Sequence, residues 1–284
     1  MELNSNTKIL IVGLGVMGGS YAKSLTKKGY KIKAIDISQK TIDYALENKL
    51  ISYGTTEVEP SLVSEADIIV FALYPHTFKK WITDYQKYFR PGIIITDVTG
   101  VKGCIVYDIQ SILREDVEFI AAHPMAGRER SGIEYSDDKV FIGANYIVTP
   151  TAKNTRQAIE LCKTLGSELG FKKISEITPE LHDEMIAFLS QLTHCIAVAL
   201  MTAGENPSLR DYSGDSFRDL TRIAKINDEM WSELFLLNRD ALLREMDSFE
   251  REFKKMRACV EKGDRETMRE MMRCSTERRA LFDK

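Results

Sequence analysis

The fold is decided by one stretch near the start of the chain, Lys8-Ile9-Leu10-Ile11-Val12-Gly13-Leu14-Gly15-Val16-Met17-Gly18-Gly19. Its apolar half is typical of a buried strand, and its glycines, spaced G-x-G-x-x-G, predict a turn into a helix over residues 16–28. The first glycine permits a tight turn, the second lets the backbone approach a pyrophosphate, and the third lets the helix lie close to the strand. Because unsatisfied N–H groups at a helix start attract phosphates, the stretch predicts a dinucleotide cradle.

A second strand, expected over residues 31–35, ends in Asp36. A carboxylate at this place accepts hydrogen bonds from the ribose hydroxyls of NAD and repels the additional phosphate of NADP. We therefore expect NAD as the cofactor; the alternative is a glycine turn beside a solvated aspartate. The residues that we assign to the cofactor site border the glycines, carry the carboxylate or end a neighbouring strand: Gly13, Leu14, Gly15, Val16, Met17, Gly18, Asp36 and Leu73.

Length and composition describe an ordinary globular protein. The 284 residues, 44% of them hydrophobic, suffice for one large core or two moderate ones. The net charge of −3 offers no basic field, so we expect no nucleic-acid partner. The five cysteines are scattered without a C-x-x-C pair, which indicates neither a metal site nor a disulfide framework. We find no signal peptide and no apolar run of about eighteen residues, and expect a cytoplasmic protein that does not contact membranes.

Strand and helix patterns alternate up to residue 177, which favours an α/β fold with a Rossmann-type, doubly wound parallel sheet. We expect strands over residues 8–12, 31–35, 66–73, 93–98, 118–122, 145–148 and 172–177. We expect helices over residues 16–28, 38–48, 77–88, 102–113 and 154–169. In open α/β sheets ligands bind at the carboxyl ends of the strands, so the residues that follow strands are the candidates for chemistry.

The chain changes character at Thr178-Pro179-Glu180, a typical helix start. Beyond it apolar residues recur at three-to-four spacing and no strand pattern is present. We expect a dinucleotide-binding domain over residues 1–177 and an all-helical substrate and dimerisation domain over residues 178–284. One helix over residues 229–261 would be about 50 Å long. Its apolar stripe suits intrachain packing or a homodimer interface, and we favour the homodimer.

The chain has four histidines, and one of them follows a strand at the cofactor crevice. This is His123, in the segment His123-Pro124-Met125-Ala126-Gly127. With a pKa near about 6.5, an imidazole there can take a proton from a substrate hydroxyl while hydride leaves the same carbon. We interpret His76 and His182 as structural side chains.

Two polar pairs and one loop are further candidates. Ser190 and His194 are four residues apart on an expected helix, where they would contact one ligand or form a buried pair bonded to backbone. Arg218 and Arg222 have the same spacing, and two guanidiniums suit a substrate with carboxylates, although ordinary surface charge is the alternative. The loop that begins at Thr99 lies past a strand end and is a candidate substrate or nicotinamide loop.

Taken together, these segments resemble the prephenate dehydrogenase family. The resemblance extends from the first strand to about residue 238. It rests on the glycine motif, on the histidine segment, and on three further motifs: Asp97-Val98-Thr99-Gly100-Val101-Lys102, Ser190-Gln191-Leu192-Thr193-His194 and Phe217-Arg218-Asp219-Leu220-Thr221-Arg222-Ile223-Ala224 followed by Met230-Trp231. Many family members carry a serine where this chain has Gly100, and Thr99 is a possible substitute for that hydroxyl.

The resemblance implies an enzyme of tyrosine biosynthesis that oxidises prephenate with NAD and releases CO2 to give 4-hydroxyphenylpyruvate. It implies that His123 bonds the 4-hydroxyl of the substrate and that Arg222 holds a carboxylate. His194 and Ser190 would orient the other end of the substrate. Glu129 corresponds to an acid near the site entrance, and Arg218 to a basic residue that lines the pocket. Feedback by tyrosine would act at the active site itself.

Three alternatives remain open at the level of sequence. Arogenate differs from prephenate by an amine in place of a keto group, and the motifs do not separate the two substrates. A β-hydroxyacid-type dehydrogenase opens with a similar glycine motif and adds a helical domain, but relies on a lysine where this chain has Ser190 and His194. A dinucleotide-sensing protein would bind NAD without needing His123.

Overall fold

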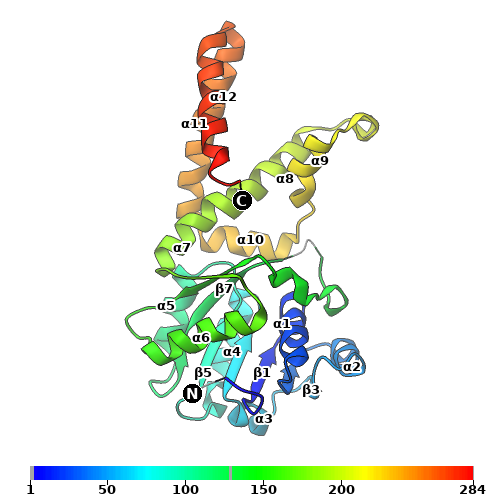
Figure 1. The fold of residues 1–284 in the computed structure, drawn as a ribbon, viewed down its shortest axis with the longest axis vertical. Helices are drawn as coiled ribbons and strands as arrows, with labels where there is room; N and C mark the ends of the chain where they lie inside the picture. Colours follow the sequence, from blue (N-terminus) through cyan, green and yellow to red (C-terminus); the bar gives the residue numbers. More distant parts are fainter. Residues whose placement is uncertain (1–2, 128–129, 284) are drawn as a thin grey trace.

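The computed structural model describes residues 3–127 and 130–283. Its N-terminal half is built on a six-stranded parallel sheet in the order β3-β2-β1-β4-β5-β6 (Figure 1). The strands are β1 (Ile9–Val12), β2 (Ile32–Ile35), β3 (Tyr53–Thr55), β4 (Ile68–Phe71), β5 (Ile94–Asp97) and β6 (Glu118–Phe119). The strand order reverses between β1 and β4, which opens a crevice at their carboxyl ends. The expected doubly wound α/β sheet is confirmed.

Helices cover both faces of this sheet, which is why β1 and β4 consist of apolar residues only. Ile9 and Ile11 of β1 belong to the core on one face, and Leu10 and Val12 to the core on the other. The helices are α1 (Val16–Lys27), α2 (Gln39–Glu47), α3 (Pro60–Glu65), α4 (Pro75–Tyr85) and α5 (Gly103–Ile112). Sequence patterns did not indicate β3 and α3, because three and six residues are too short for a periodicity.

The strand expected over residues 118–122 is divided between two sheets. After β6 the chain enters β7 (Ala121–Met125), which pairs with β8 (Asn145–Thr149) antiparallel. The strand β9 (Lys173–Glu176) pairs with β8 parallel, and α6 (Arg156–Leu169) connects the two. A buried carboxylate fixes the change of sheet, since Oδ1 of Asp97 accepts a hydrogen bond from the backbone N–H of Ala122 (3.1 Å). His123 therefore lies within β7 and not after a strand.

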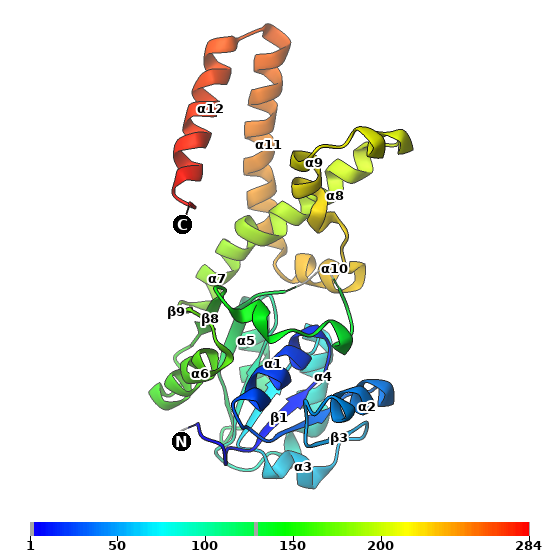
Figure 2. The same cartoon turned by 45° about the vertical axis from the view of Figure 1, so that its right-hand side comes forward.

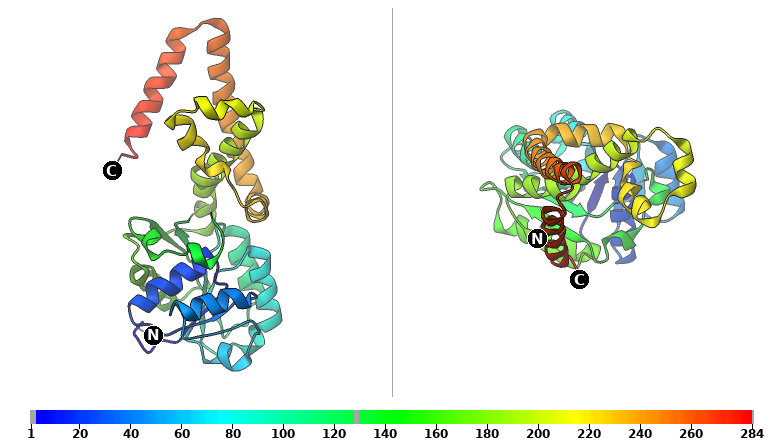
Figure 3. Two further views of the ribbon diagram at one scale, coloured as in Figure 1. Left: turned by 90° about the vertical axis from the view of Figure 1, so that its right-hand side faces the viewer. Right: turned by 90° about the horizontal axis from the view of Figure 1, so that it is seen from above.

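The C-terminal half, residues 178–283, contains helices and no strand. A continuous helical segment consists of α7 (Pro179–Ile186), the π-helical turn η4 (Ala187–Leu192) and α8 (Thr193–Ala203). It is followed by α9 (Asp215–Thr221), the 3₁₀ turn η6 (Arg222–Ala224), α10 (Asp228–Leu237), α11 (Arg239–Lys262) and α12 (Arg265–Ala280). Figures 2 and 3 show α11 and α12 as an antiparallel hairpin that projects away from the sheet.

The single helix expected over residues 229–261 is wrong, because the chain breaks at Asn238 between α10 and α11. The backbone of Asn238 has φ −114° and ψ 28°, outside the helical range. Its buried side chain donates to the carbonyl of Asp183 (2.9 Å) and to Oε1 of Gln191 (2.8 Å). These bonds anchor the junction to the preceding helical segment and let α10 and α11 run in different directions.

The expectation that no apolar run is long enough to span a bilayer is also wrong. Residues Pro179–Ala203 form a helix of 25 residues with a mean hydropathy of 1.7 in its most apolar window, of which 28% is buried. Polar residues interrupt this segment, which is why a search for an unbroken apolar run passes over it. Several large apolar side chains of this helix are exposed in a single chain, among them Phe188 and Leu189.

Candidate active site

The glycine motif forms a turn at the carboxyl end of β1. Gly13 has φ +92°, and a Cβ atom there would lie 2.5 Å from the carbonyl oxygen of Ala72. A Cβ on Gly18 would lie 1.9 Å from the carbonyl oxygen of Gly13, so only glycine fits at either place. Nothing lies within 4 Å of the corresponding point on Gly15. The turn is thus closed on the protein side and open where a dinucleotide phosphate would approach.

The carboxylate of Asp36 lies beside this turn. Its Oδ2 accepts from the N–H of Leu14 (2.7 Å) and its Oδ1 from the N–H of Ser38 (2.9 Å). Carboxylate oxygens have further lone pairs, so Asp36 keeps acceptor capacity for ribose hydroxyls. The side chain of Leu14 is fully buried in the core, so only its backbone borders the cradle.

The remaining residues assigned to the cofactor lie around the same turn. Val16 and Met17 open α1 and are partly exposed. Leu73 follows β4, and its Cδ2 atom would lie 3.0 Å from a Cβ atom on Gly13. These residues therefore form the rim of the glycine turn.

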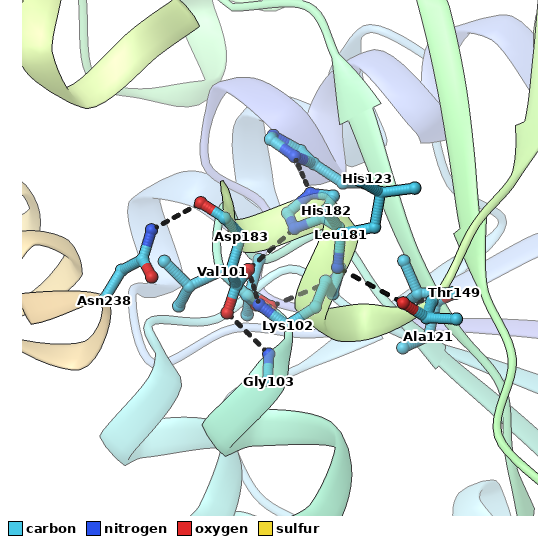
Figure 4. Close-up of polar contacts among 12 residues, drawn as sticks. Val101, Lys102, Gly103, Ala121, His123, Thr149, Leu181, His182, Asp183 and Asn238 are labelled. Atoms are coloured by element: carbon cyan, nitrogen blue, oxygen red, sulfur yellow. Dashed lines mark hydrogen bonds and ion pairs between the residues drawn. The ribbon is translucent and has the colours of Figure 1, made fainter. Parts of the chain in front are cut away.

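His123 is the first member of a hydrogen-bonded chain that crosses between the two halves of the molecule (Figure 4). Its Nδ1 lies 2.8 Å from Nε2 of His182 on α7, and Nδ1 of His182 lies 2.7 Å from Oδ1 of Asp183. The Asp183 carboxylate also accepts from the backbone N–H groups of Lys102 (2.8 Å) and Gly103 (2.7 Å) at the start of α5. It is therefore an acceptor on both oxygens.

The Asp183 carboxylate fixes the tautomers of His182 and His123, because it can only accept hydrogen bonds. His182 must donate from Nδ1 to Asp183, which leaves its Nε2 to accept from Nδ1 of His123. Nε2 of His123 is then unprotonated and able to take a proton. Burial holds the pKa of His123 well below its usual range, and His182 and the ammonium of Lys102 lower it further. His123 is thus a neutral base at neutral pH.

The interpretation of His182 as a merely structural side chain is therefore incomplete. His182 is fully buried, and burial lowers its pKa although the Asp183 carboxylate opposes the shift. Sequence reasoning missed its role because 59 residues separate it from His123. The signal that was available is the adjacent pair His182-Asp183 in the first turns of a helix whose start had been identified.

Nε2 of His123 faces the loop after β5. A Cβ atom on Gly100 would lie 3.9 Å from this nitrogen and 3.5 Å from Cδ1 of Leu234 on α10. A serine at this position would thus place its hydroxyl near the imidazole. Thr99 does not replace it: Thr99 is buried, its hydroxyl contacts the carboxylate of Asp97, and it accepts from Nζ of Lys102 (3.2 Å). The Thr99 hydroxyl is therefore bonded within the protein, and the assignment of Thr99 to the substrate stays a prediction.

A buried ion pair lies beneath the site. Nζ of Lys102 is 2.7 Å from Oδ2 of Asp97, and both side chains are fully buried. Burial lowers the pKa of Lys102, an effect that Asp97 opposes. The pair joins the end of β5, the start of α5 and, through Ala122, the strand that carries His123. Sequence analysis assigned no role to these two residues.

Ser190 and His194 lie at the π-helical turn η4 and the start of α8. Nδ1 of His194 donates to the backbone carbonyl of Ser190 (2.8 Å), and the imidazole stacks on Trp231 of α10 with 3.7 Å between ring centroids. A hydrogen bond from this pair to the backbone was the alternative to ligand binding that we considered from the sequence. Trp231 is one helical turn from Leu234, so α10 connects His194 with the loop beside His123.

The two arginines lie in two adjoining helical elements and not in one α-helix. Arg218 lies in α9 and Arg222 in the 3₁₀ turn η6, and both are exposed. The guanidinium of Arg218 donates to the carbonyl of Ser213 (2.9 Å) and lies 3.5 Å from Asp215. Both elements contact α8. Glu129 lies outside the described residues.

No group of three His, Cys, Asp or Glu side chains within residues 3–127 and 130–283 is placed to hold a metal ion. The site instead combines a dinucleotide cradle at a Rossmann switch point with a neutral histidine base. These features, with a helical second domain, define an NAD-dependent dehydrogenase.

Comparisons with known proteins identify the family. Residues 21–175 match the family model described as "Prephenate dehydrogenase, nucleotide-binding domain", and residues 178–274 match "Prephenate dehydrogenase, dimerization domain". The prephenate dehydrogenase of Bacillus subtilis (strain 168) is 32% identical over 92% of this chain and 72% of its own length. The chain belongs to the prephenate dehydrogenase family.

Solved structures agree with this assignment. The prephenate dehydrogenase of A. aeolicus in complex with hydroxyphenyl propionate and NAD+ has a TM-score of 0.90 and 32% identity, and the match covers 99% of this chain and 100% of that chain. Synechocystis arogenate dehydrogenase has a TM-score of 0.82 and 25% identity, with 98% and 100% covered. A 3-hydroxyisobutyrate dehydrogenase from Salmonella typhimurium, at 12% identity and a TM-score of 0.58, shares the fold alone.

Proposed function

We propose that this protein is a prephenate dehydrogenase of tyrosine biosynthesis, which converts prephenate and NAD to 4-hydroxyphenylpyruvate, CO2 and NADH. The observation that carries the proposal is the His123–His182–Asp183 chain at the carboxyl edge of the sheet. Curated relatives include prephenate and cyclohexadienyl dehydrogenases, and they support the same chemistry.

In the proposed reaction Nε2 of His123 takes the proton of the substrate 4-hydroxyl as hydride leaves the same carbon. NAD supplies the hydride acceptor. The bond between the ring and its carboxylate then breaks and CO2 leaves. The electron pair of that bond completes the aromatic ring, and the phenolate oxygen takes the proton back from Nε2 of His123, which gives the 4-hydroxyl of the product. His182 and Asp183 stabilise the imidazolium that forms on His123, because they hold its second N–H on an acceptor.

Substrate contacts follow from the resemblance of motifs. We assign Arg222 to a substrate carboxylate, Arg218 and Glu129 to the lining and entrance of the pocket, and His194 with Ser190 to the end of the substrate remote from the reacting carbon. The stacking of His194 on Trp231 supports its part, since it fixes the plane of the imidazole.

We further propose a homodimer formed by the helical domain, with the boundary between domains at residues 177 and 178. The dimerization-domain model covers residues 178–274. Large apolar side chains are exposed along the helical segment and α11, including Phe188 (54%), Leu189 (49%) and Phe253 (61%). A second copy would remove this surface from water. We also propose a cytoplasmic location.

The experiment that tests the function mixes purified protein with prephenate and NAD and follows the absorbance of the reduced cofactor. Parallel reactions contain arogenate in place of prephenate, or NADP in place of NAD. We expect NADH with prephenate and its loss in a His123→Asn variant. A faster reaction with arogenate would assign the protein to the arogenate dehydrogenases, and no reaction with either substrate would overturn the proposal.

A further inference from the structure

Helix α10 contacts the nucleotide-binding domain at two points beyond its apolar face. The carboxylate of Glu233 accepts a hydrogen bond from the backbone N–H of His76 (2.7 Å) and contacts Nδ1 of the same residue. The side chain of Asn227, at the start of α10, donates to the hydroxyl of Tyr74 (3.2 Å). The Glu233 side chain is only 14% exposed, so its charge is held in a nearly enclosed place.

This carboxylate completes a helix start that the local sequence leaves open. Tyr74, the N-cap residue of α4, makes no side-chain capping bond, and the first N–H groups of a helix have no partner within the helix. Glu233 supplies the acceptor from the other domain, and the positive end of the helix dipole favours its negative charge. The contact therefore stabilises the docking of α10 on α4 and not α10 alone.

The loop that Glu233 holds is the one that borders the cofactor cradle. It follows β4, and the carbonyl oxygen of Ala72 and the side chain of Leu73 are the atoms that a Cβ on Gly13 would meet, at 2.5 and 3.0 Å. The start of α4 is therefore adjacent in the chain to the loop that borders the glycine turn.

The other faces of α10 contact the substrate side of the site. Leu234 lies against Gly100, beside Nε2 of His123, and its carbonyl accepts from the side chain of Gln191 (2.9 Å). Trp231 stacks on His194. One short helix therefore joins the cofactor loop to His123 and His194.

We propose that Glu233 is a positioning residue: it clamps α10 to the cofactor loop and thereby sets the separation between the nicotinamide and the substrate carbon that loses hydride. The proposal rests on the proposed function. Glu233 touches neither substrate nor cofactor in it, and acts through Trp231, Leu234 and the loop after β4. The rate of hydride transfer falls steeply as the distance between the substrate carbon and the nicotinamide increases. A small displacement of α10 therefore slows the chemical step more than it weakens binding.

The test compares Glu233→Ala and Glu233→Gln with Glu229→Ala, a control at an exposed position of the same helix. We expect Glu233→Ala to lower kcat about tenfold or more and to increase the primary isotope effect measured with substrate deuterated at the transferred hydrogen. The Gln variant keeps an oxygen for the N–H of His76 and should recover much of the rate. The dissociation constant of NAD should change by no more than about twofold, because the glycine turn and Asp36 are untouched.

A spectroscopic measurement reports on the clamp without turnover. The chain has two tryptophans, so a Trp81→Phe background isolates the emission of Trp231. Loss of the clamp should loosen the stacking of Trp231 on His194 and change this emission in Glu233→Ala but not in Glu229→Ala.

The proposal is overturned if Glu233→Ala matches the control in kcat, isotope effect and emission, or if it lowers only the melting temperature. If the wild-type protein oxidises neither prephenate nor arogenate, the proposed function fails. In that case the emission of Trp231 still tests whether the contact between Glu233 and His76 holds α10 in place. An unchanged emission in Glu233→Ala would overturn this part of the proposal.

Discussion

Nδ1 of His123 lies 2.8 Å from Nε2 of His182, although the two residues belong to different halves of the chain and are 59 positions apart. One imidazole comes from a strand of the nucleotide-binding half and the other from the first helix of the helical half. The bond means that the protonation state of the proposed base depends on how the two halves pack. The bond between His123 and His182 therefore both orients the proposed base and joins the two domains.

Removal of the second imidazole should impair catalysis without removing the base. We expect His182→Asn to lower kcat by about tenfold to a hundredfold, because His123 loses the acceptor that fixes its tautomer. His123→Asn should lose more, since the base itself is absent. Steady-state kinetics of both variants test this prediction. A His182→Asn enzyme with wild-type kcat would contradict the proposed role of the His123–His182–Asp183 hydrogen bonds.

The histidines predict how activity depends on pH. Burial depresses the pKa of His123, so the base stays neutral to a lower pH than an exposed histidine would. The acid limb of the profile of kcat/KM should therefore fall below the ordinary histidine value of about 6.5. A limb centred above that value would contradict the assignment of His123 as the titrating group.

The same depression predicts how stability depends on pH. A histidine with a lowered pKa binds fewer protons in the folded than in the unfolded state, so its contribution is present above the unfolded pKa and lost as the pH falls through the folded one. Thermal melts at about pH 8 and about pH 5.5 should show lower stability in acid. His182→Phe should reduce this difference, and an unchanged difference would exclude His182 as a contributor.

The buried ion pair predicts an asymmetric response to mutation. Lys102→Met leaves the Asp97 carboxylate buried without its counter-charge, and we expect a loss of about 3–5 kcal/mol in the free energy of unfolding. The double variant Asp97→Asn/Lys102→Met should recover part of that loss, because no uncompensated charge remains. Urea unfolding measures both, and equal losses in the two proteins would argue against the charge as the cause.

Gly100 has room for the serine that many family members carry. A Cβ atom there meets its nearest neighbours at 3.5 Å or more, which is ordinary contact. We expect Gly100→Ser to fold with a free energy of unfolding within about 0.5 kcal/mol of wild type, and to raise kcat/KM by a fewfold, because the hydroxyl would orient His123. Thermal unfolding tests the predicted stability, and steady-state kinetics test the predicted rise in kcat/KM. A fall in kcat/KM would contradict the proposed contribution of a hydroxyl at position 100 to the orientation of His123.

The exposed helical segment predicts the effect of charge on assembly. Phe188→Glu should convert the proposed homodimer to a monomer, because a carboxylate would be buried in an apolar interface. Ile142→Glu, an equally drastic change at an exposed position of the nucleotide-binding half, should leave assembly unchanged. Light scattering after gel filtration gives the mass of each variant, and a wild-type mass for Phe188→Glu would place the interface elsewhere.

The sequence by itself determined the dinucleotide cradle and the parallel α/β class of the first half. A run of apolar residues followed by G-x-G-x-x-G specifies a strand, a turn and a helix locally, since each glycine answers a steric demand within a few residues. Asp36 at the end of the second strand followed from the same local order. The helical character of the second half was equally readable, because the three-to-four spacing of apolar residues is also a local property.

Only the tertiary structure decided how these parts meet. The change of sheet at Ala121, the break at Asn238 and the bond between His123 and His182 each depend on a partner far away in the chain. Sequence periodicity reports which face of an element is buried, but not which polar group lies opposite it. The hydrogen bonds of buried polar groups are set by packing, and for that reason the residues that position the proposed base became visible only in the folded chain.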